Sequence, residues 1–97
     1  MRFEIILSPE AVEDLQSLKA KVRSEVHDAL ETHLRNEPKK TSRSRIKRLR
    51  GLTKPQFRLR VDEWRIFYDV AGSTVEILAI VPKSEAESWL AQFGNHE

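Results

Sequence analysis

The chain has 97 residues, 39% of them hydrophobic, so it can bury one modest core and is expected to form a single domain over residues 1–97. It contains no cysteine, which excludes disulfides and thiolate metal sites. No segment approaches the roughly 20 consecutive apolar residues of a membrane-spanning helix, and the N-terminal apolar run is too short for a signal peptide. These features predict a cytoplasmic protein with no membrane partner.

Charge is distributed unevenly along the chain. The net charge is +2, from 17 Lys and Arg against 15 Asp and Glu, yet no acid occurs between Glu37 and Asp62. That interval contains ten cations: Lys39, Lys40, Arg43, Arg45, Lys47, Arg48, Arg50, Lys54, Arg58 and Arg60. The seven other cations accompany all 15 acids, so the rest of the chain has a net charge of −8. A solvated surface usually mixes both signs, so this block favours a polyanion or an acidic protein partner.

The first 36 residues predict a strand followed by helix. Apolar residues alternate over 3–7, and then Ser8 and Pro9 provide a helix N-cap and a first helical residue. Apolar residues recur at steps of three or four until Pro38, which predicts one buried helical stripe within residues 9–36. One long helix or a hairpin broken near residues 19–21 would both fit, because no Gly or Pro marks a break.

The second half predicts a basic connector, three strands and a helix. Residues 38–56 hold two prolines, a glycine and eight of the ten cations of the acid-free block, and are interpreted as an ordered-to-mobile basic connector within the domain. Alternating apolar residues then predict strands at 57–61, 64–70 and 75–81, the last in a central position, and a final helix at 83–93. The predicted class is α+β, with the N-terminal strand and the antiparallel three-strand meander completing one sheet.

The meander predicts a face that carries three arginines. A two-residue turn at Asp62-Glu63 would pair Arg60 with Arg65 and Arg58 with Phe67, so that these residues share one face. The other face would hold the core residues Phe57, Leu59, Val61, Trp64, Ile66 and Tyr68. Like charges across a ladder are destabilising by a few tenths up to ~1 kcal/mol. Phosphates would offset this repulsion, because guanidinium groups bind phosphate oxygens in bidentate fashion and stay charged. Solvated arginines on an exposed sheet face are the alternative.

Other chemical signals are weak. His27 and His33 are six residues apart, which does not suit a metal site on one helix face, so neither a metal nor a cofactor is predicted. Phosphate-binding glycine loops and the common hydrolase motifs are absent from the sequence. His96 lies in the terminal GNHE, where a frayed tail is expected.

The whole arrangement resembles the RelE/ParE superfamily of bacterial toxins. The resemblance covers nearly the whole chain and rests on the stretches LRG, FRLRVDEWRIFY and VEILAIVPKSEAESW. Its most specific part is the Leu49-Arg50-Gly51 turn before a strand with alternating basic residues, followed by an aromatic-Arg-x-x-Tyr strand at residues 64–68. The RelE branch, which we prefer, implies a ribosome-dependent mRNA endonuclease that is held inactive by an antitoxin encoded beside it.

This resemblance implies a set of site residues. The catalytic cations would be Arg58, Arg60 and Arg65. Candidate contacts to RNA or the ribosome are Arg45, Lys47, Arg48, Arg50, Lys54 and Lys83. These cations would stabilise the charge that accumulates on phosphorus when a ribose 2′-OH attacks the adjacent phosphate.

The chain also departs from the RelE pattern. RelE has lysines where this chain has Arg58 and Arg60, and an arginine and a catalytic tyrosine where it has Ser84 and Leu90. The general acid and base are therefore not identified. Possible substitutes are Tyr68, Glu85, Glu87 and His96.

Three functions follow from the resemblance. The first is an mRNA endonuclease, supported by the arginine face. The second is a ParE-like toxin that poisons DNA gyrase, favoured by the missing acid and base, and the third is an inactive relic that only binds antitoxin. Expected partners are a cognate antitoxin, the ribosome and mRNA, with a possible toxin–antitoxin complex that binds operator DNA through the antitoxin.

Overall fold

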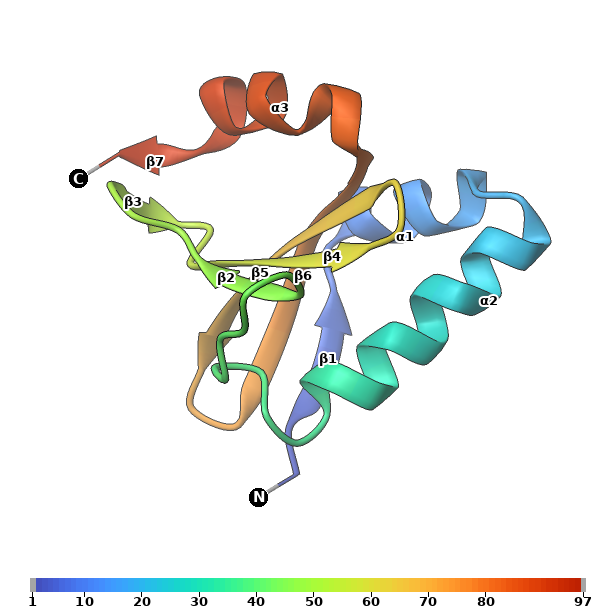
Figure 1. Cartoon of the computed structure of the whole chain (residues 1–97), viewed down its shortest axis with the longest axis horizontal. Coiled ribbons are helices and arrows are strands. Elements are labelled where there is room, and N and C mark those ends of the chain that lie inside the picture. Colours follow the sequence, from blue (N-terminus) through green and yellow to red (C-terminus); the bar gives the residue numbers. More distant parts are fainter. Residues whose placement is uncertain (1, 97) are drawn as a thin grey trace.

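The computed structural model describes residues 2–96, which form one mixed α+β domain with a helical layer on each side of a sheet (Figure 1). The elements in chain order are β1 Glu4–Leu7, α1 Pro9–Ser17, α2 Ala20–Ala29, a π turn Leu30–Leu34, β2 Ile46–Arg48, β3 Leu52–Lys54, β4 Phe57–Val61, β5 Trp64–Ala71, β6 Thr74–Pro82, a 3₁₀ turn Lys83–Glu85, α3 Ala86–Phe93 and β7 Asn95–His96. The first two helices and α3 lie on opposite faces of the sheet, so each face has its own apolar cluster.

The helical region is a hairpin, which decides between the two predicted arrangements. Ser8 caps α1, with its Oγ accepting from the N–H of Ala11 at 3.1 Å. The helix ends at Leu18, where the backbone becomes extended, and Lys19 continues that extended conformation before α2 begins. Leu18 is buried in the main core at this corner. Burial of its side chain explains how the break forms without Gly or Pro.

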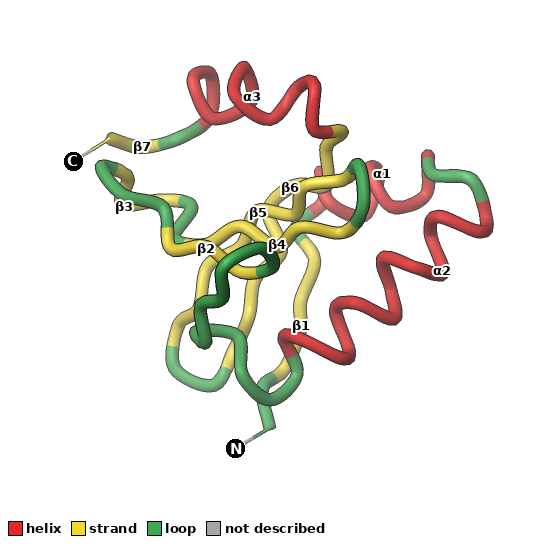
Figure 2. The backbone as a smooth tube through the Cα atoms, in the orientation of Figure 1, coloured by secondary structure: helices red, strands yellow, loops and turns green. Residues whose placement is uncertain are grey.

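The sheet has five strands in the order β1-β6-β5-β4-β2 (Figure 2). β1 runs parallel to β6, and the other neighbours are antiparallel. The basic connector over residues 38–56 contains two short strands that the sequence did not predict, β2, which pairs with β4, and β3. Only Ile46 of β2 is apolar and buried, so the strand has no detectable alternation. Short edge strands with Lys and Arg are a common protection against further strand pairing.

The meander has the predicted register. Arg60 lies opposite Arg65, and the Asp62-Glu63 turn connects β4 to β5 with Asp62 at φ 53°. The β5–β6 pairing contains an irregularity that was not predicted, because Phe67 pairs with Ala79 and the next residue pairs with Ile77. This bulge leaves Leu78 as an extra residue in β6. The chain thereby turns Ala79 and Val81 toward α3 and keeps Ile77 and Ile80 in the main core.

The bulge is held by the start of α1. Ser8 Oγ donates to the carbonyl oxygen of Leu78 at 3.1 Å, and the N–H of Ile80 donates to Asp14 Oδ2 at 2.9 Å. Both contacts satisfy backbone groups that a regular ladder would pair. The same α1 residues that cap and anchor the helix therefore also fix the shape of β6.

The C-terminal segment packs on the second face of the sheet. The Trp89 ring is stacked on Phe67, with centroids 4.9 Å apart, and no residue of α3 is buried. The expected frayed tail at His96 is wrong, because Asn95–His96 pair with β3, where His96 lies opposite Leu52. The Thr53 hydroxyl adds a hydrogen bond to the Asn95 carbonyl at 3.2 Å. The closeness of Gly94 to Leu90 and Leu52 is what lets the chain return to β3.

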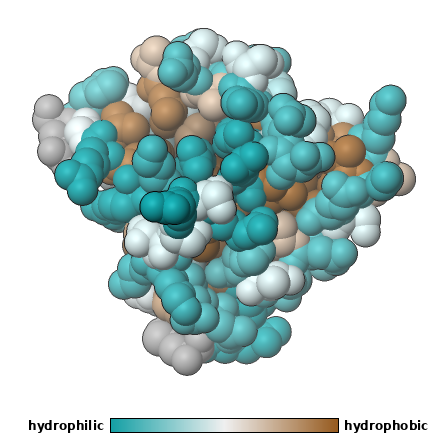
Figure 3. Space-filling model, viewed as in Figure 1, coloured by the Kyte–Doolittle hydropathy of each residue, from teal (hydrophilic) through white to brown (hydrophobic). Residues whose placement is uncertain are grey.

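No helix within residues 2–96 is long and apolar enough to cross a membrane. The surface over the strands in the view of Figure 3 is mainly hydrophilic, with hydrophobic surface exposed below α3.

Candidate functional site

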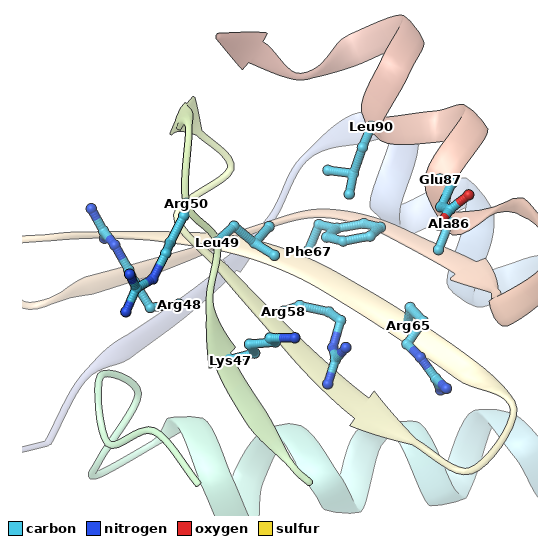
Figure 4. Close-up of a pocket in the computed structure, with 10 residues that line it drawn as sticks. All are labelled: Lys47, Arg48, Leu49, Arg50, Arg58, Arg65, Phe67, Ala86, Glu87 and Leu90. Carbon is cyan, nitrogen blue, oxygen red and sulfur yellow. The ribbon is translucent and has the colours of Figure 1, made fainter. Parts of the chain in front are cut away.

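A hollow of about 430 Å³ lies where β4, β5 and the β2–β3 segment face α3 (Figure 4). We call it the basic hollow. Its lining residues are Lys47, Arg48, Leu49, Arg50, Arg58, Arg65, Phe67, Ala86, Glu87 and Leu90. The sheet contributes the cations at its floor, and the hydrophobic cluster around Phe67 separates them from the body of α3.

Arg58 is the central cation of the basic hollow. Its partners in the register are Phe67 on β5 and Lys47 on β2, so it lies between two strands on the arginine face. The Nε atom of Arg58 is buried and has no hydrogen-bond partner within the described residues. Burial, followed by the nearby charges of Arg65 and Arg60, lowers the pKa of Arg58 from its ordinary value. Both the unpaired N–H and the crowding of like charges would be relieved by an anion.

Arg65 is fixed in place by the backbone. It is the one buried charged residue within 2–96, with 7% of its surface exposed. Its Nη1 donates to the carbonyl oxygens of Asp62 at 2.8 Å and Trp64 at 3.0 Å. These bonds leave a positive charge at the wall of the basic hollow without using a carboxylate. Arg60 shares the face but is exposed and does not line the hollow.

The connector contributes Lys47 and Arg50. Lys47 lies opposite Arg58, and its amine points toward that side chain in Figure 4. Arg50 is exposed at the end of the hollow beside Leu49. Arg48 also borders the hollow, but its guanidinium lies 5.2 Å from the centre of the Phe57 ring on the opposite face of the sheet. Alternation along β2 separates Arg48 from Lys47 in this way.

The helix side of the hollow holds one carboxylate among the described residues, that of Glu87. Glu87 is exposed and forms no ion pair within residues 2–96. Leu90 projects from α3 toward Phe67, at the place where the RelE pattern implies a tyrosine. The position predicted for a catalytic group is therefore in the hollow but carries a hydrocarbon side chain.

Tyr68 lies away from the hollow and cannot reach it. It is fully buried on the opposite face, where its ring stacks on Phe57 and its hydroxyl donates to the Pro38 carbonyl at 2.6 Å. Burial raises the pKa of Tyr68 well above its ordinary value. The period of two along β5 explains this placement, because Arg65 and Phe67 take one face and Tyr68 takes the other.

Four other predicted residues also lie elsewhere. Lys54 is 3.8 Å from Glu76 and 4.0 Å from Asp69, and so is paired with acids. Arg45 lines a separate hollow beside His33, and Glu85 lines a groove on the far side of α3. Lys83 is exposed and does not line the basic hollow.

His96 lies next to the site. It lines a smaller hollow that shares Arg50, Glu87 and Leu90 with the basic hollow. The β3–β7 pairing brings it there, and that pairing could not be predicted, because a two-residue strand has no periodicity.

Sequence reasoning also missed the hydrophobic wall of the site. Alternation along β5 predicts Phe67 on the arginine face, but its packing with Trp89 and Leu90 depends on the position of α3, which the sequence does not show. Within residues 2–96, no three His, Asp or Glu side chains are grouped in a way that could hold a metal ion. The arrangement is suited to binding an anion through its cations and the unpaired Nε–H group of Arg58.

Comparison with known proteins identifies the family. Residues 5–87 match the family described as the ParE toxin of the type II toxin–antitoxin system parDE. The chain belongs to this toxin family. The resemblance to the RelE/ParE superfamily is thereby confirmed, and the protein is a toxin of a toxin–antitoxin system. No protein with a curated functional description matches the chain significantly.

Several solved structures share the fold. The toxin–antitoxin complex RelBE2 of Mycobacterium tuberculosis superposes with a TM-score of 0.72 at 23% identity, covering 84% of this chain and 99% of the other. The archaeal RelE–RelB complex of Pyrococcus horikoshii superposes with a TM-score of 0.70 at 22% identity, covering 86% of this chain and 97% of the other. A mutant of the E. coli toxin RelE in the free state superposes with a TM-score of 0.71 at 18% identity, covering 92% of each chain. These similarities confirm the predicted RelE-like fold.

Proposed function

We propose that this toxin is a ribosome-dependent endonuclease that cleaves mRNA at a phosphate held in the basic hollow. The observation that carries the proposal is the buried, unpaired Nε of Arg58, next to Lys47 and the immobilised Arg65. A buried N–H without an acceptor is costly, and no carboxylate within residues 2–96 forms an ion pair with Arg58 that would offset that cost. A phosphate oxygen would supply the missing acceptor and the missing negative charge together.

Preorganised cations favour phosphate cleavage more than phosphate binding. In the proposed reaction the ribose 2′-oxygen forms a bond to phosphorus while the bond from phosphorus to the 5′-oxygen breaks. One proton leaves the 2′-hydroxyl and one is taken up by the 5′-oxygen, giving a 2′,3′-cyclic phosphate and a 5′-hydroxyl. The intermediate carries more charge on its phosphoryl oxygens than the substrate, so fixed cations stabilise it preferentially.

Two side chains are available for the proton transfers. We assign the acceptor to Glu87, whose carboxylate lines the basic hollow, and the donor to His96, which lines the adjoining hollow. Tyr68 is excluded by its burial, and Glu85 by its position in the groove beyond α3. The hollow is open, so the ribosome is assigned the role of holding the mRNA in the in-line geometry that the reaction needs.

Poisoning of DNA gyrase is the second candidate. The matching family model is that of the ParE toxins, and the chain has Leu90 where the RelE pattern has tyrosine. Under this function, the arginine face would bind the antitoxin instead of RNA.

Under either function the toxin has a cognate antitoxin as its partner. The similar RelBE2 and RelE–RelB structures are toxin–antitoxin complexes. We expect the antitoxin to place acidic residues over the basic hollow. If the complex binds operator DNA, we expect the antitoxin to make that contact.

The test compares the two toxin activities in parallel. Purified toxin is added to a cell-free translation system and transcript 5′ ends are mapped by primer extension, and in a second reaction it is incubated with gyrase and supercoiled plasmid. We expect new ends within translated codons, absent without ribosomes and absent with the Lys47→Ala/Arg58→Ala variant, and no linear plasmid. Intact transcripts together with trapped linear plasmid would contradict the endonuclease activity and support poisoning of gyrase.

A further inference from the structure

A second groove lies on the far side of α3 from the basic hollow, where α1 and α3 approach each other beside β6. This groove has a volume of about 590 Å³ and runs between α1, the bulged part of β6 and α3. Its apolar lining includes Leu78, Val81, Trp89 and Phe93. Phe93 is 56% exposed, the highest among the large hydrophobic residues of the described chain that lie on the surface. An exposed aromatic ring beside an apolar groove is typical of a protein-binding surface.

The rim of the groove is acidic. Glu10 and Glu13 project from α1 and Glu85 lies at the start of the α3 segment, all three exposed. None of them forms an ion pair within residues 2–96. The groove's single cation, Lys54, is already paired with Asp69 and Glu76. Asp14 also lines the groove, but its carboxylate is occupied by the N–H of Ile80.

The α3 helix therefore separates two surfaces of opposite charge. The basic hollow lies on one side, and the groove with its acidic rim lies on the other. A partner that covered both with uniformly acidic chain would meet repulsion at Glu10, Glu13 and Glu85. An uncharged chain would leave the three carboxylates unpaired.

We propose that this groove, here called the acidic groove, binds a basic segment of the cognate antitoxin. The segment has an apolar or aromatic side chain that rests on Phe93 and Trp89, with Lys or Arg residues on either side that pair with Glu13 and Glu85. This assignment rests on the antitoxin partner of the proposed function and adds a second contact, of opposite charge to the one over the basic hollow. The antitoxin is thus bipolar, with an acidic segment for one side of α3 and a basic segment for the other.

The experiment uses the antitoxin encoded beside the toxin and 15-residue peptides that tile its sequence. Affinities are measured by titration calorimetry for the wild-type toxin, Glu13→Lys, Phe93→Ala and a control, Glu25→Lys. Glu25 is exposed in α2 as Glu13 is in α1, so both reversals change the charge equally on a helix surface. A further variant, Arg58→Ala, reports on the basic hollow.

We expect Glu13→Lys and Phe93→Ala to weaken binding of the antitoxin at least tenfold, and Glu25→Lys to change it less than twofold. The Glu13→Lys effect should shrink as salt is raised, whereas the Phe93→Ala effect should persist. The peptide whose affinity falls in both variants should carry net positive charge, and its binding should be unchanged in Arg58→Ala.

Equal affinities for Glu13→Lys and Glu25→Lys, or tighter binding by Glu13→Lys, would overturn the acidic groove as the site of a basic segment. If the wild-type toxin did not bind the antitoxin at all, the assignment of that protein as its partner would be wrong, and this proposal would fail with it. Both readouts are affinities, so a toxin that poisons gyrase instead of cutting mRNA would still give a result here.

Discussion

Arg58 and Arg65 place guanidinium groups in the basic hollow without a carboxylate partner among the described residues, which requires an explanation at the scale of single residues. Both residues lie at the floor of the basic hollow. Backbone carbonyls hold Arg65, whereas Arg58 is half-buried on β4 between β2 and β5, with its Nε atom buried. Clustered like charges destabilise the folded protein unless something neutralises them. Phosphate or an acidic antitoxin segment would supply that neutralisation, and both would compete for the same atoms.

Tyr68 belongs to the aromatic-Arg-x-x-Tyr motif, but its role is structural. Its hydroxyl is within 2.6 Å of the Pro38 carbonyl, which ties the start of the connector to β5. We expect Tyr68→Phe to lower the free energy of unfolding by about 1–3 kcal/mol, because the buried carbonyl of Pro38 loses its donor. Urea denaturation measures the loss, and the cleavage rate per folded molecule should not change. A variant of unchanged stability but much lower activity would contradict this structural role.

At the scale of the elements, the strongly periodic segments were predictable and the short ones were not. Alternation over β4 and β5 predicted the register that places Arg58, Arg60 and Arg65 on one face, and the apolar stripe predicted the helices. β2, β3 and β7 have two or three residues each, which is too short for a period to be visible. Their pairings depend on tertiary contacts, and so did the placement of Lys54 and His96.

The position of α3 could not be predicted either, although it forms one wall of the site. No residue of α3 is buried, and the helix is held by the stacking of Trp89 on Phe67 and by the β3–β7 pairing that follows it. Such a segment has few buried apolar contacts, so it is expected to open locally before the rest of the domain unfolds.

Gly94 makes the β3–β7 pairing possible, which gives a test at this scale. A Cβ at position 94 would lie 2.5 Å from the Leu90 carbonyl oxygen and 3.3 Å from Leu52 Cδ2. Since backbone must move to admit it, Gly94→Ala should separate β7 from β3 and raise hydrogen exchange over residues 86–96, while β5 and β6 stay protected. Gln92→Ala, a change at an exposed position of α3, is the control. Exchange identical to that of the wild type would show that the close approach at Gly94 is not required.

At the scale of the whole molecule, charge is separated in space as well as along the sequence. The acid-free block contributes Lys47, Arg50 and Arg58 to the basic hollow, whereas the acidic remainder contributes Glu10, Glu13 and Glu85 to the groove beyond α3. The net charge of +2 conceals this arrangement. Under the proposed function, one side of the molecule would approach RNA and the other would bind a basic protein segment.

Under the proposed function, the basic hollow cleaves ribosome-bound mRNA, and a single-turnover rate tests this most directly. Toxin in excess is mixed with ribosomes programmed with a short labelled mRNA, for the wild type, Arg58→Ala and Arg43→Ala. Arg43 is an exposed connector cation outside the hollow, so its removal controls for the loss of one positive charge. We predict a fall of about 100-fold or more for Arg58→Ala, as for loss of one preorganised donor to a developing oxyanion, and less than twofold for Arg43→Ala. Equal rates for Arg58→Ala and the wild type would contradict the assignment of the basic hollow as the cleavage site.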